Sequence, residues 1–257
     1  MAARGVLVTR PAGQGDALCE GINARGLRAH QLPLLALEPL AELPAAERTR
    51  VLALDEFHHI IFISANAVRF GMEVIENYWP QLPLGLNWYA VGDGTARALA
   101  AFGVTAQTPG SDMTSEGLLA LPGLQHCSGE RVLLVKGEGG REALARALVA
   151  RGARVDTLAC YRRLAPALAS GEFAAAVARW DIGLVMISSG EGLANMLALL
   201  SPEESSKLQD ICLLLPSGRV AAAAAAAGFR HCLVAGNASD KAMLRALDEW
   251  VADTGDK

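Results

Sequence analysis

The chain has no long hydrophobic run, few charged residues and few aromatic residues. Only 19% of its 257 residues are charged and 5% are aromatic. No apolar stretch approaches the roughly 20 residues of a membrane-spanning helix, and the N-terminus has no extended apolar segment like that of a signal peptide. The net charge is −4 and the basic residues are scattered, which argues against a nucleic-acid surface. We therefore expect neither a membrane partner nor a nucleic-acid partner.

Disulfide, metal and nucleotide-binding patterns are also missing. The five cysteines are far apart with no CxxC pair, and the five histidines show no HExxH or related spacing. Unpaired, widely spaced thiols are typical of a reducing compartment, so we expect a cytoplasmic protein without a metal site. The turn Gly92-Asp93-Gly94 lacks the third glycine of a dinucleotide fingerprint, and Ser189 does not lie in the frame of a nucleophile elbow.

What the chain does have is 52% hydrophobic residues, arranged as short apolar runs that alternate with helical patterns. The runs are continuous and rich in Val, Ile and Leu, from Val6–Thr9 near the N-terminus to His231–Val234 near the C-terminus. Strands buried on both faces have this composition, because helices cover both sides of a parallel sheet. The pattern predicts an α/β fold of mostly parallel sheets with helices on both faces.

The sequence also repeats itself. In each copy a buried apolar run ends in a small polar residue, where a helical pattern begins, and a second such unit follows. From Ser64 to Gly92 is 28 positions, and from Ser188 to Ser217 is 29. An internal duplication of this kind predicts two similar lobes, and small ligands bind in clefts between such lobes.

Two proline-interrupted segments, Leu34–Glu47 and Tyr161–Gly171, have the composition of linkers and each follows an expected strand. If both connect lobes, residues 38–163 form one α/β lobe, and residues 1–37 with 164–257 form the other. Such a discontinuous lobe requires two chain crossings, which we expect to be neighbours in space and to act as a hinge.

Six turns place small or polar residues where an expected strand ends and a helix begins. Such turns expose backbone N–H groups and the positive end of a helix dipole at the carboxyl edge of a parallel sheet, where anions bind. The same residue types are ordinary caps and turns, so a structural role stays open for each turn alone. Their repetition favours a small-molecule ligand with many acidic groups. The expected ligand-binding residues are Arg10, Ser64, Asn66, Gly92, Thr95, Ser115, Lys136, Ser188, Ser189 and Ser217.

Tyr161 is one of only three tyrosines, and it lies where an expected strand meets the second linker. A phenol at a hinge can donate a proton to a leaving oxygen. It can equally pack beneath a linker with its hydroxyl in water. The residues alone leave both roles open, and packing is the more ordinary of the two.

Several motifs occur in a recognisable order along nearly the whole chain. They are VLVTRP, FISANAV, YAVGDGTARAL, TSEGLL, VLLVKGEGGREALARAL followed by ARGARVDTLACYRR, and ISSGEGL. This ordered set resembles the uroporphyrinogen-III synthase family. The C-terminal repeat departs from the first, since Ser217 stands where the first has Gly92 and Val220 stands where it has Thr95.

The resemblance implies two flavodoxin-like lobes joined by a two-stranded linker, in a monomer without cofactor or metal. It implies an enzyme whose substrate is hydroxymethylbilane, a linear tetrapyrrole with eight carboxylates. The reaction removes the terminal hydroxyl as water, inverts ring D and closes the macrocycle to uroporphyrinogen III. Tyr161 matches the family's tyrosine that is proposed to assist loss of the hydroxyl.

Two other classes fit some of the same features. A two-lobed binding protein could close on a polycarboxylate ligand without catalysis, although periplasmic proteins of that kind carry a signal peptide. A nucleotide-sugar transferase also has two lobes, but this sequence has no acidic motif for a metal bound to a diphosphate. Turnover of hydroxymethylbilane, with isomer III resolved from isomer I, would distinguish all three.

Overall fold

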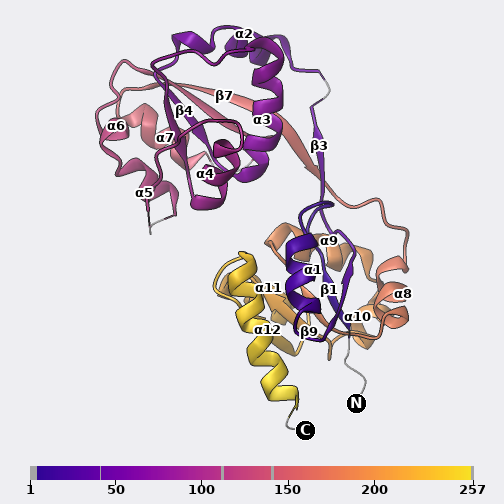
Figure 1. The fold of residues 1–257 in the computed structure, drawn as a ribbon. Helices are drawn as coiled ribbons and strands as arrows, with labels where there is room; N and C mark the ends of the chain where they lie inside the picture. Colours follow the sequence, from indigo (N-terminus) through magenta and orange to yellow (C-terminus); the bar gives the residue numbers. More distant parts are fainter. Residues whose placement is uncertain (1–4, 41, 111–112, 140–141, 256–257) are drawn as a thin grey trace. The chain divides into compact units, whose positions relative to one another are not determined.

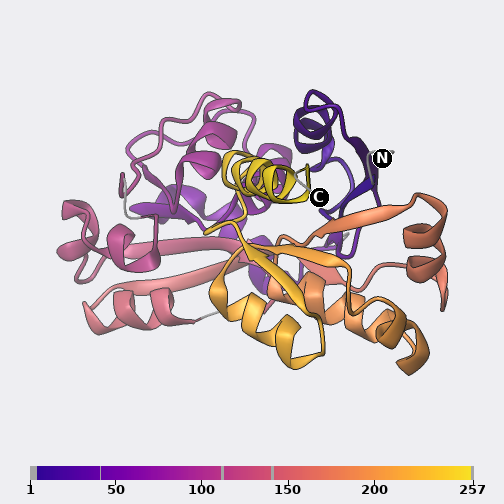
Figure 2. The same ribbon diagram turned by 90° about the horizontal axis from the view of Figure 1, so that it is seen from below.

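A computed structural model describes residues 5–40, 42–110, 113–139 and 142–255 (Figures 1 and 2). The chain divides into two compact units. Unit 1 comprises Met1–Ala36 and Leu164–Lys257, and unit 2 comprises Leu37–Arg163. Each unit contains one five-stranded sheet. The chain therefore leaves unit 1 after its first strands and returns to it once unit 2 is complete.

The sheet of unit 1 has the strand order β10-β9-β8-β1-β2, and every neighbouring pair is parallel. In the order of the chain within this unit, the arrangement reads 2-1-3-4-5, which is the flavodoxin-like order. The strands are β1 (Gly5–Val8), β2 (Arg28–Gln31), β8 (Ile182–Met186), β9 (Cys212–Leu215) and β10 (His231–Val234).

Helices cover both faces of this sheet. One face packs against α1 and α12, which contact each other, and the opposite face packs against α8, α9 and α11 (Figures 1 and 2). The three central strands are buried along their whole length, as expected for a sheet between two helical layers. The helices of the unit are α1 (Asp16–Asn23), α8 (Glu172–Arg179), α9 (Gly190–Leu199), α10 (Pro202–Lys207), α11 (Gly218–Ala226) and α12 (Asp240–Gly255).

The sheet of unit 2 has the order β3-β7-β6-β4-β5. Its strands are β3 (Ala36–Pro39), β4 (His59–Phe62), β5 (Asn87–Ala90), β6 (Arg131–Gly137) and β7 (Arg154–Leu164). The stretch β7-β6-β4-β5 is parallel and repeats the arrangement β2-β1-β8-β9 of unit 1. Gln107 forms an isolated parallel bridge to Tyr89 of β5, at the place that β10 takes in unit 1. The duplication seen in the sequence is therefore a duplication of sheet topology.

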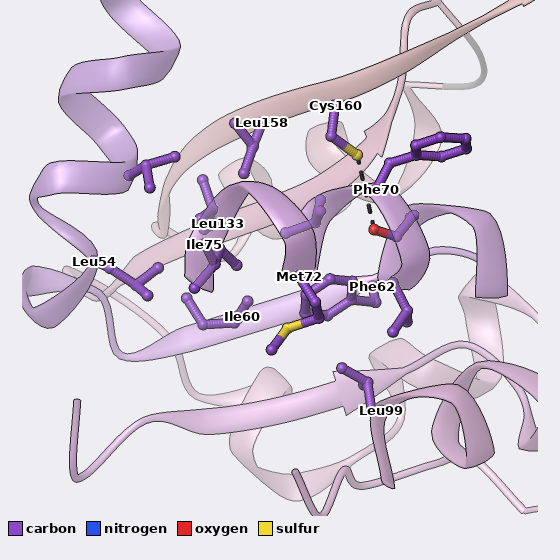
Figure 3. Packing of buried hydrophobic residues seen from close by; sticks show 14 of the residues in the cluster. Leu54, Ile60, Phe62, Phe70, Met72, Ile75, Leu99, Leu133, Leu158 and Cys160 are labelled. Carbon is purple, nitrogen blue, oxygen red and sulfur yellow. Dashed lines mark hydrogen bonds between the residues drawn. The ribbon is translucent and has the colours of Figure 1, made fainter. Parts of the chain in front are cut away.

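One face of the unit 2 sheet packs under α3, and Figure 3 shows this core. The side chains of Phe62, Met72 and Leu133 lie among its buried members, and the thiol of Cys160 donates to the carbonyl oxygen of Ala67 at 3.7 Å. The opposite face packs against α5, α6 and α7. The helices of the unit are α2 (Ala45–Leu52), the 3₁₀ turn η1 (Leu54–Glu56), α3 (Ala65–Tyr78), α4 (Asp93–Ala100), α5 (Ser115–Leu119), α6 (Pro122–Gln125) and α7 (Ala143–Ala150).

The fold class predicted from the sequence is confirmed, but two predicted linker segments contain regular structure. Part of the first segment forms β3, which lies next to β7 in the sheet (Figure 1). The strand β7 continues to Leu164, so Tyr161 lies inside a strand and the prediction that it opens a linker was wrong. An ion pair between Arg162 and Glu38, at 3.0 Å, joins the two strands close to where the chain enters and leaves unit 2. Among the described helices, none is both long and apolar enough to cross a bilayer.

Candidate active site

Each sheet carries two turns of the same backbone conformation at its carboxyl edge. The φ and ψ angles are −164° and 162° at Ser64, −159° and 170° at Gly92, −157° and 159° at Ser189, and −159° and 158° at Ser217. Ser64 and Ser189 cap α3 and α9, and the distance along the chain to the next turn is 28 positions in both units. The equivalent of Ser64 is therefore Ser189, so the sequence comparison that paired Ser64 with Ser188 was wrong by one residue.

The four turns differ in whether a side chain accepts a hydrogen bond from a backbone N–H group in the first turn of the helix. The hydroxyl of Ser64 accepts from the backbone N–H of Ala67 at 3.1 Å, and that of Ser189 accepts from Gly192 at 3.0 Å. Gly92 and Ser217 make no side-chain cap. A helix without a side-chain cap has backbone N–H groups in its first turn that another acceptor can bind. The N-termini of α4 and α11 are therefore better suited to bind an anion than those of α3 and α9.

In unit 1, the switch point of the strand order lies between β1 and β8, and ligands of open α/β sheets bind outside such points. The hydroxyl of Thr9 donates to the carbonyl oxygen of Met186 at 2.7 Å and ties the two strand ends together. The hydroxyl oxygen of Ser188 is buried and has no hydrogen-bond partner in the described ranges. A buried, unsatisfied hydroxyl at a switch point is a group that a ligand can satisfy.

Arg10 lies at the same edge, but its guanidinium group already forms an ion pair within the protein. Its side chain is 15% exposed and forms an ion pair with Asp240 at 2.5 Å. It also donates to the carbonyl oxygen of Ala238 at 2.7 Å. These contacts fasten the start of α12 to the end of β1. The sequence identified Arg10 as a source of positive charge and missed Asp240, because the two residues are 230 positions apart.

Two substitutions distinguish a role of Arg10 in stabilising the fold from a role in binding a ligand. Arg10→Ala should lower the free energy of unfolding by about 1–2 kcal/mol, since hydrogen bonds to charged groups are lost and one partner is partly exposed. Asp240→Asn keeps the guanidinium and removes its counter-charge. If Arg10 also binds substrate, Arg10→Ala should raise the Michaelis constant and Asp240→Asn should not. Denaturant unfolding and steady-state kinetics of both variants measure this, and equal rises would exclude a ligand role.

In unit 2, the corresponding switch point lies between β6 and β4. The register pairs Val135 with Phe62, which places Lys136 beside Ile63, directly before the Ser64 turn. The Lys136 ammonium group makes no ion pair or hydrogen bond to any described residue. Asn66 follows in the first turn of α3 and is half-buried. This edge thus offers a cation that nothing in the described chain neutralises.

The remaining predicted residues of unit 2 surround the α4 turn. A side chain at Gly92 would meet Met113, whose sulfur lies 3.4 Å from the ideal Cβ position, so the segment before α5 lies against this turn. Thr114 caps α5 by accepting from Gly117 at 3.0 Å, and Ser115 is the first residue of that helix. Thr95 is buried in α4, which places its side chain in the packing of that helix.

Tyr161 lies at this edge as a buried residue of β7. Its ring stacks on Phe70, with centroids 5.1 Å apart and an interplanar angle of 27°. The ring also covers Gly137 of the neighbouring strand, where an added Cβ would lie 2.7 Å from it. The hydroxyl makes no hydrogen bond to a described residue. The ring is therefore held on two sides, while its hydroxyl has no partner within the described chain.

Cys160, next to Tyr161, has a side chain that is suited to packing and not to catalysis. Its side chain points into the core under α3 and donates to the carbonyl oxygen of Lys136 at 3.2 Å. Burial raises the pKa of the Cys160 thiol to about 12, so the thiol stays protonated and is a poor nucleophile. The candidate site of unit 2 thus rests on the Tyr161 hydroxyl, the Lys136 ammonium group and the helix N-termini.

The structure brings the predicted residues to the carboxyl edges of their own sheets, four in unit 1 and the others in unit 2. Sequence reasoning missed the partners that hold them, namely Asp240 for Arg10 and the pair Phe70 and Gly137 for Tyr161.

Residues 16–245 match the profile of a family described as uroporphyrinogen-III synthase HemD. The chain belongs to the uroporphyrinogen-III synthase family. The resemblance inferred from the ordered motifs is thereby confirmed.

Relatives within the uroporphyrinogen-III synthase family match over most of their length. The chain is 34% identical to uroporphyrinogen-III synthase of Escherichia coli (strain K12) over 247 residues, covering 94% of this chain and 99% of that one. It is 28% identical to the synthase of Synechococcus elongatus over 202 residues, covering 76% of this chain and 74% of that one.

Solved structures of the family show the same fold. A mutant uroporphyrinogen III synthase from the extremely thermophilic bacterium Thermus thermophilus matches with a TM-score of 0.61 at 20% identity, covering 98% of this chain and 100% of that one. Uroporphyrinogen-III synthetase of Helicobacter pylori 26695 also matches with a TM-score of 0.61, at 15% identity, covering 96% of this chain and 99% of that one.

Proposed function

We propose that this protein is a uroporphyrinogen-III synthase, which cyclises hydroxymethylbilane to uroporphyrinogen III with loss of water and inversion of ring D. The observation that carries the proposal is 34% identity to a named synthase across nearly the full length of both chains. The free thiols of all five cysteines support a reducing, cytoplasmic location. We further propose that the protein acts as a monomer.

Each sheet carries, at its carboxyl edge, groups of the kind that bind the carboxylates of such a substrate. In unit 2 these are the uncapped N-terminus of α4 and the Lys136 ammonium group. In unit 1 they are the uncapped N-terminus of α11 and the unsatisfied hydroxyl of Ser188. Backbone N–H groups at helix N-termini bind carboxylates without a dedicated cation. Such groups would allow a protein with a net charge of −4 to bind a polyanion.

The Tyr161 hydroxyl is the group proposed to assist departure of the substrate hydroxyl. It transfers its proton to that oxygen as the carbon–oxygen bond breaks, so the oxygen leaves as water and Tyr161 becomes a phenolate. The substituted α-carbon of ring D then attacks the cationic bilane and forms a spirocyclic pyrrolenine. The bond from that carbon to the methylene of ring C breaks, the methylene rejoins ring D at its other α-carbon, and loss of a proton to the Tyr161 phenolate completes the macrocycle. Inversion of ring D depends on how the substrate is held, which is catalysis by orientation. This account requires no further acid–base pair.

Lys136→Ala should weaken substrate binding and leave turnover at saturation nearly unchanged, because the ammonium group acts by charge. The loss should be greater at low ionic strength, where the attraction is less screened. Steady-state kinetics at two salt concentrations measure this, with Lys136→Arg as the charge-preserving control. A Michaelis constant unaffected by Lys136→Ala at low salt would remove Lys136 from the site.

The proposed function is tested by incubating the protein with hydroxymethylbilane and separating the oxidised products by isomer. A synthase produces isomer III faster than the free substrate closes to isomer I. A binding protein for polycarboxylates would protect the substrate or leave only isomer I. A nucleotide-sugar transferase would not alter the isomer ratio at all.

A further inference from the structure

A pocket of about 480 Å³ lies in unit 2 between α7 and the strands β6 and β7. Its walls are mostly aliphatic, and its volume falls within the range of about 300–1,000 Å³ for small-molecule sites. The pocket is lined by Ile63, Leu134, Leu144, Ala145, Val149, Ala150, Val155 and Thr157, with Lys136, Glu142 and Arg146 as its charged members.

The charges of the pocket favour an anion. Lys136 comes from the end of β6 and Arg146 from α7, and neither side chain makes an ion pair or hydrogen bond to a described residue. Glu142 is the single carboxylate among the described residues of the lining, which therefore keep one excess positive charge. Two cations and one carboxylate beside aliphatic walls, with a net charge of +1, suit a compact ligand with an apolar body and an acidic side chain.

The pocket is continuous with the edge that carries the candidate site. Ile63 directly precedes the Ser64 turn, and Lys136 lies beside it at the switch point between β4 and β6. Ile63 and Val149 keep 37% and 56% of their surface exposed, although both are aliphatic. Exposed aliphatic side chains around a concave site indicate a surface that a ligand covers.

We propose that this pocket binds a pyrrole ring that carries carboxylate side chains, with the ring against the aliphatic walls and a carboxylate facing Lys136 and Arg146. The choice of a pyrrole rests on the proposed function, whereas the preference for an acidic ligand with an apolar body rests on the lining alone. Such a ring belongs either to one end of the tetrapyrrole or to a free monopyrrole. Both sources present the same chemistry to the pocket.

The probe is porphobilinogen, a monopyrrole with one acetate and one propionate, titrated against the full chain by calorimetry. Val149→Asp places a negative charge in the lining and should weaken binding about tenfold. Val149→Asn has the same shape without the charge and should weaken it far less. Val149 is largely exposed on α7, so both variants should fold, and thermal unfolding checks this. Arg146→Gln, which removes a cation, should also weaken binding.

Two further arms distinguish the source of the ring and separate this proposal from the proposed function. Competitive inhibition of hydroxymethylbilane turnover by porphobilinogen assigns the pocket to a ring of the substrate. Binding without inhibition assigns it to a free monopyrrole, and either result supports the pocket. Absence of saturable binding, or binding unchanged in Val149→Asp, overturns it. Formation of isomer III by the unaltered protein reports on the proposed function independently of all these results.

Discussion

Tyr161→Phe should lower the rate of isomer III formation by about 10²-fold, in the usual range for loss of a general acid. The substitution removes one oxygen, and the ring that stacks on Phe70 and covers Gly137 remains. The hydroxyl makes no hydrogen bond within the described chain, so its removal leaves no described protein group unsatisfied. The free energy of unfolding should therefore stay within about 0.5 kcal/mol of the unaltered value.

The product mixture supplies a second measurement for this variant. Free hydroxymethylbilane closes without inversion to isomer I, so a slow enzyme leaves more substrate to that route. The fraction of isomer I should rise as turnover falls, and it should fall again when more Tyr161→Phe protein is added. Full turnover with only isomer III would make Tyr161 a packing residue. Inversion would then depend on backbone N–H groups and the shape of the site.

Much of the fold could be predicted from the sequence, because most strands are short, apolar and followed by a helical pattern with its own start and stop signals. The glycine that follows α4 and the one that follows α11, Gly103 and Gly228, are 11 positions from the start of their turns in both copies. Both have positive φ, 73° and 98°, as helix-ending glycines do. Local signals of this kind fix the elements and reveal the duplication.

The edge strand and the exact position of Tyr161 could not be predicted from local pattern. β3 is a four-residue strand that contains Pro39, and proline is typical of linkers and edge strands alike. The strand β7 continues past Tyr161 because β3 lies beside it, a pairing between segments more than 100 positions apart. Such long-range pairing leaves no mark in the hydrophobic period of either segment.

The candidate site shows the same limit. Strand-end turns could be recognised, since their chemistry is local, but the partners of the charged residues could not. Arg10 and Lys136 look alike in the sequence, each a cation at the end of an apolar run. In the structure Arg10 is paired with Asp240, whereas the Lys136 ammonium group has no partner among the described residues. Which cation is available to a ligand is decided by tertiary contacts alone.

Gly137→Ala should reduce turnover by about tenfold or more, although the substitution leaves the Tyr161 hydroxyl chemically intact. An added Cβ would lie 2.7 Å from the Tyr161 ring, a distance that forces the ring or the strand to move. The stacked Phe70 blocks one direction, so the hydroxyl should be displaced by enough to lose its alignment with the departing oxygen. The steric strain should also lower the free energy of unfolding by about 1–3 kcal/mol.

A double-mutant cycle distinguishes this positioning role of Gly137 from simple destabilisation. If Gly137→Ala acts by displacing the Tyr161 hydroxyl, then adding it to Tyr161→Phe should cost little further turnover, because the displaced group is already absent. Its cost in unfolding free energy should persist in the double variant, since the ring is still present. Equal and additive losses of turnover in the two backgrounds would show that Gly137 affects the enzyme through its strand and not through Tyr161.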